Sequence, residues 1–374
     1  MIINQLVMKQ YDFSKVVDRK GSGSIKVDGV KKVFGKEDLM PMWVADMDFE
    51  TPDFIVDELR QRLEHPIFGY TYEPEDYRPA IVDWVYGRHG WKTEKEWISY
   101  IPGIVKGIGM AINALLEKDD KIIIQPPVYH PFRLVSQKNG HEVVFNPLRE
   151  MPDGSYEMDF ENLQQVCDEK CKMLILSNPH NPAGIVWSHE TLQKLAEFCH
   201  RKGVIVISDE IHCDILFHHK FTSIVGVSEY ARNNTIALCS IGKTFNLAGL
   251  KMGCAIIKNE TLRKAFIEES ECVGNTSINC LAEEAYKAAY NDGDEWLDQC
   301  LEYIEKNIDW TIEQFKINFP EMHIHKPEGI YMLWVDLSMF HIECEDTQKY
   351  FFEYADTYVT QGAFFGNEYK NYIR

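Results

Sequence analysis

Three polar side chains follow three separate runs of apolar residues. They are Asn181 after the run 173–176, Asp209 after the run 204–207 and Lys243 after the run 235–238. Such runs are typical of buried parallel strands, whose carboxyl ends meet at the edge of an open α/β sheet where ligands bind. An amide, a carboxylate and an amine at this edge match an aldehyde cofactor that carries a ring nitrogen and a ring oxygen. The set predicts a pyridoxal phosphate site.

Lys243 is the predicted Schiff-base lysine of this site. A lysine amine becomes a nucleophile when burial or neighbouring charge disfavours its charged form. A lysine taken alone is most often an ordinary surface residue. Ser240, three positions earlier, and Lys251, eight positions later, favour the catalytic interpretation, because both could bind the phosphate of the cofactor.

Asp209 and Asn181 each have a structural alternative. Asp209 would pair with the protonated ring nitrogen, since an unpaired carboxylate at the end of an apolar strand is costly. It could instead cap a following helix. Asn181 would donate to the ring oxygen, or it could simply form a turn between its flanking prolines.

The aromatic face and the phosphate of the cofactor have further candidates. Tyr129, in a proline-rich stretch, would stack on the pyridine ring. The backbone amides of Gly103, Ile104 and Val105 precede a predicted helix, and helix N-termini bind phosphate. As a glycine motif alone, this stretch is weak.

The segments between these motifs predict a mostly parallel sheet covered by helices. Apolar runs alternate with amphipathic stretches, such as the helix whose apolar face includes Leu192 and Leu195 and which Gly203 can end. After about residue 285 a long helix, stopped by Pro320, precedes a strand-like run over 330–335. We predict an N-terminal segment, 1–48, that contributes to a small domain, a large cofactor-binding domain over 49–285, and a small α+β domain over 286–374.

Composition excludes several classes of function. The 374 residues include 39 basic and 58 acidic side chains, and the net charge of −19 argues against nucleic acid or an anionic membrane as the main partner. Residues 1–9 lack the pattern of a secretory signal. The nearest approach to a membrane span, 101–116, is broken by Pro102, Gly103 and Lys106.

The ten cysteines indicate a reducing cytoplasm rather than a disulfide framework. They are scattered, and Cys199 and Cys239 lie in predicted core segments. Cys167 and Cys171 are four positions apart, but no second ligand pair has the spacing of a zinc site. We therefore expect reduced thiols and no metal site.

Longer motifs carry a family resemblance. They are the stretches 11–24, Trp43–Phe49, Phe68–Thr71, Asp209–His212 and Lys243–Leu250. With them the chain resembles fold-type I pyridoxal phosphate enzymes, the aspartate aminotransferase superfamily (aminotransferase class I/II). Within it, the chain is most similar to the MalY/PatB-type carbon–sulfur lyases, which are cystathionine β-lyase-like. The motifs span nearly the whole chain, and the second and fourth separate this subgroup from general aminotransferases. The resemblance implies an α/β fold of the fold-type I pyridoxal phosphate transferase type.

The resemblance implies roles for several cofactor ligands. Lys243 would carry the cofactor and later move the substrate α-proton. Asp209 would pair with the pyridine nitrogen and Asn181 with the ring oxygen. His212 stands three residues after Asp209, where many transaminases have a tyrosine and the lyase group has a histidine.

The resemblance also implies a shared active site. Tyr70 would reach the phosphate of the neighbouring subunit, which implies an obligate homodimer. Arg374 would grip the substrate α-carboxylate with two hydrogen bonds, and we expect Trp43 and Ala45 to contact the substrate. Related chains continue beyond this arginine, whereas this sequence stops there. We therefore expect either a small domain that is incomplete at its end or a frayed terminus that binds carboxylate poorly.

The predicted reaction is α,β-elimination of L-cystathionine or another S-substituted L-cysteine to pyruvate, ammonia and a thiol. The freed Lys243 amine would take the α-proton as a general base. Tyr129, Tyr70 and Lys243 are candidate proton donors to the leaving sulfur, and the sequence does not choose among them. Cystathionine, cystine and cysteine all stay open as substrates.

Two other functions are alternatives to the lyase. An aminotransferase would use every one of the same cofactor ligands, so only the subgroup motifs favour the lyase. A regulatory protein that binds a transcription factor is the second alternative, because some members of the lyase group do this. A complete set of Lys243, Asp209 and Asn181 argues for retained catalysis.

Overall fold

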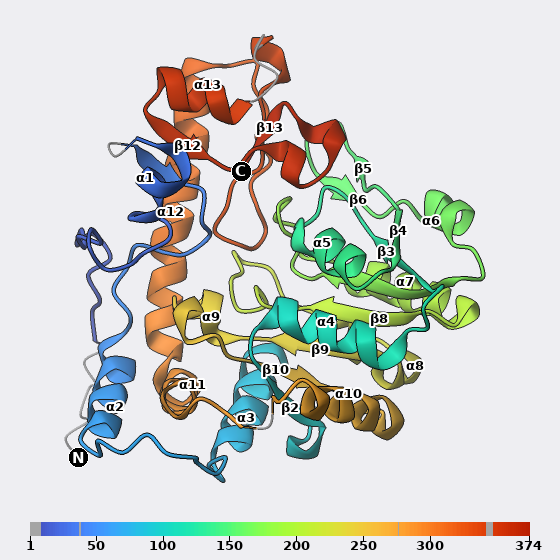
Figure 1. Cartoon of the computed structure of the whole chain (residues 1–374). Coiled ribbons are helices and arrows are strands. Elements are labelled where there is room, and N and C mark those ends of the chain that lie inside the picture. Colours follow the sequence, from blue (N-terminus) through green and yellow to red (C-terminus); the bar gives the residue numbers. More distant parts are fainter. Residues whose placement is uncertain (1–8, 37–38, 276, 342–346) are drawn as a thin grey trace, which may run out of the picture.

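The computed structural model of the chain describes residues 9–36, 39–275, 277–341 and 347–374. Its centre is a seven-stranded sheet (Figure 1). In spatial order the strands are β2 (Ile98–Ile101), β10 (Gly253–Ile256), β9 (Thr235–Cys239), β8 (Ile205–Asp209), β7 (Cys171–Ser177), β3 (Lys121–Ile124) and β4 (Glu142–Phe145). The pairs from β9 to β4 are all parallel, and only β10 runs antiparallel to its neighbours. The predicted mostly parallel sheet is confirmed.

Side chains alternate between the two faces of this sheet, and each face is covered by helices. Ile122 and Ile124 of β3 share a core with α4 (Ile104–Leu115), α5 (Pro131–Lys138) and α10 (Glu260–Cys272). Ile123 lies in the opposite core with α6 (Phe160–Val166), α7 (His189–Lys202) and α8 (Glu229–Asn233). Because successive residues of a strand point to opposite faces, an all-apolar run is what a sheet buried on both sides requires.

A third core packs around the carboxyl-terminal helices. It joins α3 (Tyr77–His89), α11 (Cys280–Asp292) and α12 (Asp294–Asn318), and α11 also packs on α2 (Asp53–Leu63). Figure 1 shows α12 running from α11 toward α13 (Thr347–Tyr354) beside the sheet. The predicted long helix before Pro320 is present in α12. The helix predicted to end at Gly203 also does so, with this glycine in the left-handed region at φ 65°.

The strand predicted over 330–335 is wrong for most of its length. Of this run, only Val335 belongs to a strand, β11 (Val335–Asp336). Ile330 has a φ of 63°, and its N–H group donates to the Ile215 carbonyl at 2.9 Å. A β-branched residue in the left-handed region breaks an extended run, so the chain turns here before β11 begins.

An early strand and a late strand of the chain lie side by side. β1 (Met40–Met42) pairs in parallel with β12 (Thr357–Val359), and β11 pairs with β13 (Tyr372–Ile373) in an antiparallel ladder. The pairing of an early strand with a late one supports the predicted contribution of 1–48 to the small domain, although the domain boundaries stay a prediction. Among the described residues, no helix has the length and apolar content needed to cross a membrane.

Shorter elements complete the chain. They are α1 (Gly29–Phe34), α9 (Ile241–Thr244), the hairpin of β5 (Arg149–Glu150) and β6 (Tyr156–Glu157), and single 3₁₀ turns at Lys95–Trp97, Ile224–Gly226, Ala248–Leu250, Ser338–Phe340, Gly362–Phe364 and Asn367–Tyr369. Of these, α9 matters most for the site, because it carries Lys243.

Candidate active site

The sheet register brings the predicted cofactor ligands to one edge. Ser177, the last residue of β7, pairs with Asp209 at the end of β8, and Asp209 pairs with Leu238 of β9. The N–H group of Asn178 then donates to the Asp209 carbonyl at 2.9 Å. The segments that follow these three strands, which carry Asn181, Asp209 and Lys243, therefore start next to one another, as predicted.

Asp209 is buried, with 6% of its surface exposed. Burial raises the pKa of Asp209 to about 7, against the opposing effects of the Ile211 N–H group and of Lys243. The Ile211 N–H group donates to the carboxylate at 3.1 Å within a turn, and no helix follows the strand, so the helix-cap alternative does not apply. A buried carboxylate with one backbone donor is well suited to pair with a cationic ring nitrogen.

Lys243 lies in α9, one turn beyond the end of β9. Its Nζ atom donates to the carbonyl oxygen of Ala45. Burial lowers the pKa of Lys243 to about 8, and the charge of Arg374 acts in the same direction, while Asp46 and Asp209 oppose the change. A lysine in this range supplies a substantial neutral fraction near pH 8, as a nucleophile or general base requires.

Arg374 is held by three oxygen acceptors. Its Nη1 atom donates to Asn181 Oδ1 at 3.3 Å, and its Nη2 atom donates to the Trp43 carbonyl at 3.1 Å and to Thr360 Oγ1 at 3.4 Å. Burial lowers the pKa of Arg374 to about 10, while Tyr129 and Tyr331 oppose the change. Its Cζ atom lies 5.1 Å from the centre of the Phe365 ring.

The prediction of a frayed end at Arg374 is wrong. The backbone N–H group of Arg374 donates to the Thr360 carbonyl at 2.9 Å, and the Thr360 N–H group donates back at 3.2 Å. The preceding residues form β13, which pairs with β11. The paired backbone fixes the guanidinium inside the site.

Asn181 is oriented by its neighbours. Its N–H group donates to Ser177 Oγ at 3.1 Å, and its Oδ1 atom accepts from Arg374. In the described part of the chain its Nδ2 group meets no protein acceptor, so the amide presents a donor to a ligand. This orientation matches a bond to the ring oxygen of the cofactor.

The charged groups of the site act on the pKa values of Tyr129 and His212. Burial raises the pKa of Tyr129, and Asp209 adds to the effect, while Arg374 opposes it. Burial holds the pKa of His212 well below its ordinary value, with Lys243 and Arg374 acting in the same direction, so the ring is neutral. His212 is buried, and its Nδ1 atom has no hydrogen-bond partner within the described residues.

The predicted phosphate ligands start from neighbouring strand ends. Gly253 pairs with Ile101 and Cys254 with Cys239, which brings Lys251, Gly103 and Ser240 to the same edge. Gly103 directly precedes Ile104 and Val105, which form the first turn of α4. It has a φ of 110°, and a side chain at this position would meet open space. Lys251 is exposed. These features fit an anion site at the helix N-terminus.

Ser240 is already engaged by protein groups. Its Oγ atom donates to the Met252 carbonyl at 2.6 Å and accepts from the Gly242 N–H group at 3.0 Å. The hydroxyl therefore ties α9 to the start of β10, and its service as a phosphate ligand stays a prediction.

Tyr70 is not brought to the other site residues within this chain. It lies between α2 and α3 with its side chain fully exposed, as are its neighbours Tyr72 and Phe68 in large part. This placement agrees with a role toward a neighbouring subunit, which stays a prediction.

Sequence reasoning missed two groups that contact the site. The hydroxyl of Tyr331 donates to the Ala45 carbonyl at 3.1 Å, the same oxygen that accepts from Lys243. Thr360 donates to the Trp43 carbonyl at 2.9 Å besides accepting from Arg374. Trp43 and Ala45 thus contribute backbone oxygens here, and the indole of Trp43 donates elsewhere, to Lys26. No motif around Tyr331 or Thr360 signals these contacts.

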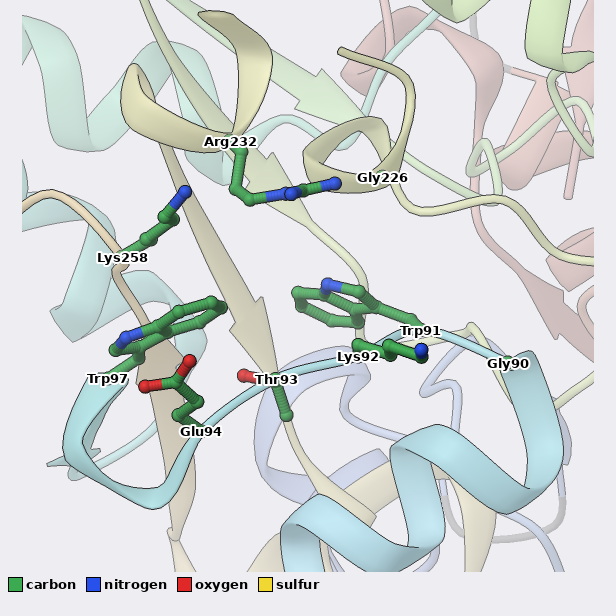
Figure 2. Close-up of a pocket in the computed structure, with 9 residues that line it drawn as sticks. All are labelled: Gly90, Trp91, Lys92, Thr93, Glu94, Trp97, Gly226, Arg232 and Lys258. Atoms are coloured by element: carbon green, nitrogen blue, oxygen red, sulfur yellow. The ribbon is translucent and has the colours of Figure 1, made fainter. Parts of the chain in front are cut away.

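Two surface cavities do not coincide with the predicted site. One of them, shown in Figure 2, has a volume of about 440 Å³, and none of the predicted site residues lines it. Its lining residues are Gly90, Trp91, Lys92, Thr93, Glu94, Trp97, Gly226, Arg232 and Lys258. A second, of about 290 Å³, lies beside the site, because Val128, His130 and Phe365 line it next to Tyr129 and Arg374.

Comparison with known proteins agrees with this geometry. The family model for aminotransferase class I and II matches residues 37–374. The chain belongs to this family. It is 38% identical to cystathionine β-lyase PatB of Bacillus subtilis (strain 168), over 97% of this chain and 94% of that protein. It is 32% identical to protein MalY of Escherichia coli (strain K12), over 97% and 93% of the two chains.

Solved structures agree as well. Cystalysin from Treponema denticola, which contains a pyridoxal 5′-phosphate cofactor, is 29% identical and matches with a TM-score of 0.94, over 98% of this chain and 94% of that one. The pyridoxal phosphate-bound C–S lyase from Staphylococcus hominis is 33% identical with a TM-score of 0.91, over 98% and 93%. The predicted family and fold are confirmed.

The described residues of this aminotransferase class I and II chain fit pyridoxal phosphate. Asp209 is a buried carboxylate without a cationic partner in hydrogen-bond contact, Lys243 is an amine of lowered pKa, and Asn181 presents a free donor. The open space at Gly103 would admit a phosphate against the first amides of α4. These groups would bind the ring nitrogen, the aldehyde carbon, the ring oxygen and the phosphate.

Proposed function

We propose that this chain is a pyridoxal phosphate-dependent carbon–sulfur β-lyase. It performs α,β-elimination on L-cystathionine or a related S-substituted L-cysteine and releases pyruvate, ammonia and a thiol. The observation that carries the proposal is the geometry around Lys243, an amine of lowered pKa beside Asp209 and Arg374, in a chain 38% identical to a cystathionine β-lyase. Pyridoxal phosphate, when bound, supplies an aldehyde for amines and a ring that withdraws electrons from the substrate α-carbon.

Arg374 orients the substrate. Its planar guanidinium can donate two parallel hydrogen bonds to the α-carboxylate, which fixes the substrate more firmly than a single charge would. The contacts with the Trp43 carbonyl and Asn181 Oδ1 hold the guanidinium in place before the substrate arrives. Preorganisation of this kind lowers the entropic cost of reaching the reactive geometry.

Lys243 moves the protons. Its Nζ atom, in the neutral form that the lowered pKa favours, takes the α-proton of the oriented substrate. The Ala45 carbonyl accepts from Nζ and so ties the amine to the N-terminal segment. Asp209 would hold the ring nitrogen of the bound cofactor in its protonated form, and Asn181 would donate to the ring oxygen.

The leaving thiolate needs a proton donor. Tyr129 is one candidate, because its buried phenol is protonated at neutral pH. Lys243, after it has taken the α-proton, and Tyr70 are the other two candidates. His212, which is neutral and buried, would instead contact the cofactor.

We further propose a homodimer with shared active sites in the cytoplasm. The exposed side chain of Tyr70 would complete the phosphate site of the partner subunit. All cysteines in the described residues are free thiols, which supports a reducing compartment.

An aminotransferase is the second candidate function. A putative aminotransferase from Clostridium difficile 630 matches with 39% identity and a TM-score of 0.95, over 97% of this chain and 94% of that one. Such an enzyme would use the same residues, but it would return a proton to the cofactor instead of expelling a thiolate.

Product analysis separates the two functions. The cofactor-loaded protein is incubated with L-cystathionine without any keto acid, and pyruvate and homocysteine are measured over many turnovers. Equal amounts of both products support the β-lyase. Turnover that begins only after a keto acid is added would overturn the lyase in favour of the aminotransferase.

A further inference from the structure

One hydrogen bond joins the two segments that carry Asp209 and Lys243. Asp214 lies at the end of the turn that follows Asp209, and Thr244 directly follows Lys243 in α9. The Thr244 hydroxyl donates to Asp214 Oδ2 at 2.8 Å, and both side chains are buried. The bond therefore bridges the ends of β8 and β9 just behind the predicted cofactor site.

Asp214 is itself fixed from the other side. Its Oδ1 atom accepts from Trp84 Nε1 at 3.0 Å and lies 2.8 Å from His89 Nε2. Both partners belong to α3, and Trp84 stacks on Tyr290 of α11 with ring centres 4.9 Å apart. A buried carboxylate with three donors at this spacing has one strongly preferred position.

The His89 and Asp214 pair is charged. Burial alone would lower the pKa of His89, but the hydrogen bond to Asp214 and the neighbouring Cys213 thiol raise it to about 10. Burial alone would raise the pKa of Asp214, but His89, Thr244 and Trp84 hold it below its ordinary value. A buried ion pair is costly to break one partner at a time, which makes this contact rigid.

A metal ion is the alternative use of this cluster. His89, Cys213 and Asp214 offer ligand atoms within 4.8 Å of one another. However, both oxygens of Asp214 already accept hydrogen bonds, and Nε2 of His89 is protonated toward one of them. The cluster therefore works as a hydrogen-bond network.

We infer that His89, Asp214 and Thr244 form a positioning network that sets the place of Lys243 relative to Asp209. None of the three residues is a predicted cofactor ligand. They act through the segments that carry Asp209 and Lys243. The inference rests on the proposed function only in taking Lys243 as the amine that reacts with the cofactor.

The variant Thr244→Val tests this network. It removes the hydroxyl with little change in side-chain shape, and it leaves Arg374, Asp46 and Asp209, the charged groups that act on Lys243, in place. We expect kcat to fall about 10-fold with little change in KM, since small displacements of a reacting group lower rates steeply. We also expect a shifted midpoint when the visible absorbance band of the bound cofactor is titrated with pH.

Two companion variants make the test specific. Thr244→Ser keeps the hydroxyl and should restore both kcat and the titration midpoint. Thr235→Val makes the same chemical change at the start of β9, where the buried Thr235 hydroxyl has no partner among the described residues. It controls for any general loss of packing and should leave the cofactor band unchanged.

The outcomes separate this inference from the proposed function. The network would be overturned if Thr244→Val had the same kcat as Thr235→Val and the same midpoint in the pH titration of the cofactor band. A lowered kcat and an altered cofactor band in Thr244→Val, with both unchanged in Thr235→Val, support it. Failure of the unsubstituted protein to bind pyridoxal phosphate at Lys243 would instead contradict the proposed function.

Discussion

Arg374 donates to Asn181 Oδ1 at 3.3 Å, so the residue proposed to bind the substrate carboxylate also orients the residue proposed to bind the cofactor. The Asn181 amide has one acceptor and one donor group. Because Arg374 takes the acceptor, the Nδ2 donor is left for the ring oxygen. Substrate orientation and cofactor orientation are therefore linked through one contact.

We predict that Arg374→Lys lowers kcat/KM for an S-substituted cysteine by about 10- to 100-fold, mainly through a higher KM. A lysine keeps the charge but loses the planar pair of donors, and charged hydrogen bonds contribute roughly 1.5–3 kcal/mol. Steady-state pyruvate release measures the effect. The exposed Arg149, which pairs with Glu157 at 3.5 Å, is the matched control, and Arg149→Lys should match the unsubstituted enzyme. Equal values for both variants would exclude the proposed carboxylate contact.

The pH dependence of cofactor capture should report the pKa of Lys243. We expect the rate at which the cofactor-free protein captures pyridoxal phosphate to rise with pH and to level off above a midpoint near 8, because only the neutral amine reacts. Removing the positive charge with Arg374→Gln should move this midpoint up, whereas removing the negative charge with Asp209→Asn should move it down. Stopped-flow absorbance measures both. A rate that keeps rising beyond pH 10 in all three proteins would indicate an ordinary exposed lysine instead.

Asp209→Asn should have opposite effects on the stability of the two forms of the protein. In the cofactor-free form the folded-state pKa of Asp209 is raised, so its contribution to stability is present below pH 4 and is lost as pH rises through about 7. At pH 8 the asparagine variant should therefore be more stable without cofactor, by roughly 2–4 kcal/mol. With cofactor bound it should be less stable, since the partner of the ring nitrogen is gone.

Thermal unfolding of both forms at pH 4 and pH 8 measures this difference. The cofactor-free proteins should unfold at similar temperatures at pH 4 and diverge at pH 8. A variant that is less stable in both forms and at both pH values would show that Asp209 is a structural residue, contrary to its proposed role.

The strand ends and their polar residues were predictable because local pattern determines them. The apolar run 204–207 comes just before Asp209 in the sequence. The strand that this run forms therefore ends at the site and places the carboxylate there. The alternation of runs and amphipathic stretches likewise predicts a parallel sheet covered on both faces.

The hydrogen bonds around Lys243 were not predictable, because their partners come from distant segments. Ala45 and Lys243 are 198 positions apart, and Tyr331 is 286 positions from Ala45. Only the packing of the N-terminal and carboxyl-terminal segments brings these groups together. The interruption at Ile330 has the same cause, because its left-handed backbone is held by the Ile215 carbonyl rather than by neighbours in sequence.

Mixed dimers should show whether Tyr70 acts on the partner subunit. Tyr70→Ala and Lys243→Ala should each be nearly inactive as homodimers. In a mixed dimer, the protomer that keeps Lys243 receives an intact Tyr70 from its partner, so one of the two sites is complete. We therefore expect the mixed dimer, purified after co-expression with two different tags, to regain activity at about half the level of the unsubstituted dimer. If Tyr70 acts within its own chain, neither site is complete and the mixed dimer stays inactive. Tyr72→Ala, which changes an equally exposed neighbour, serves as the control and should leave the homodimer active.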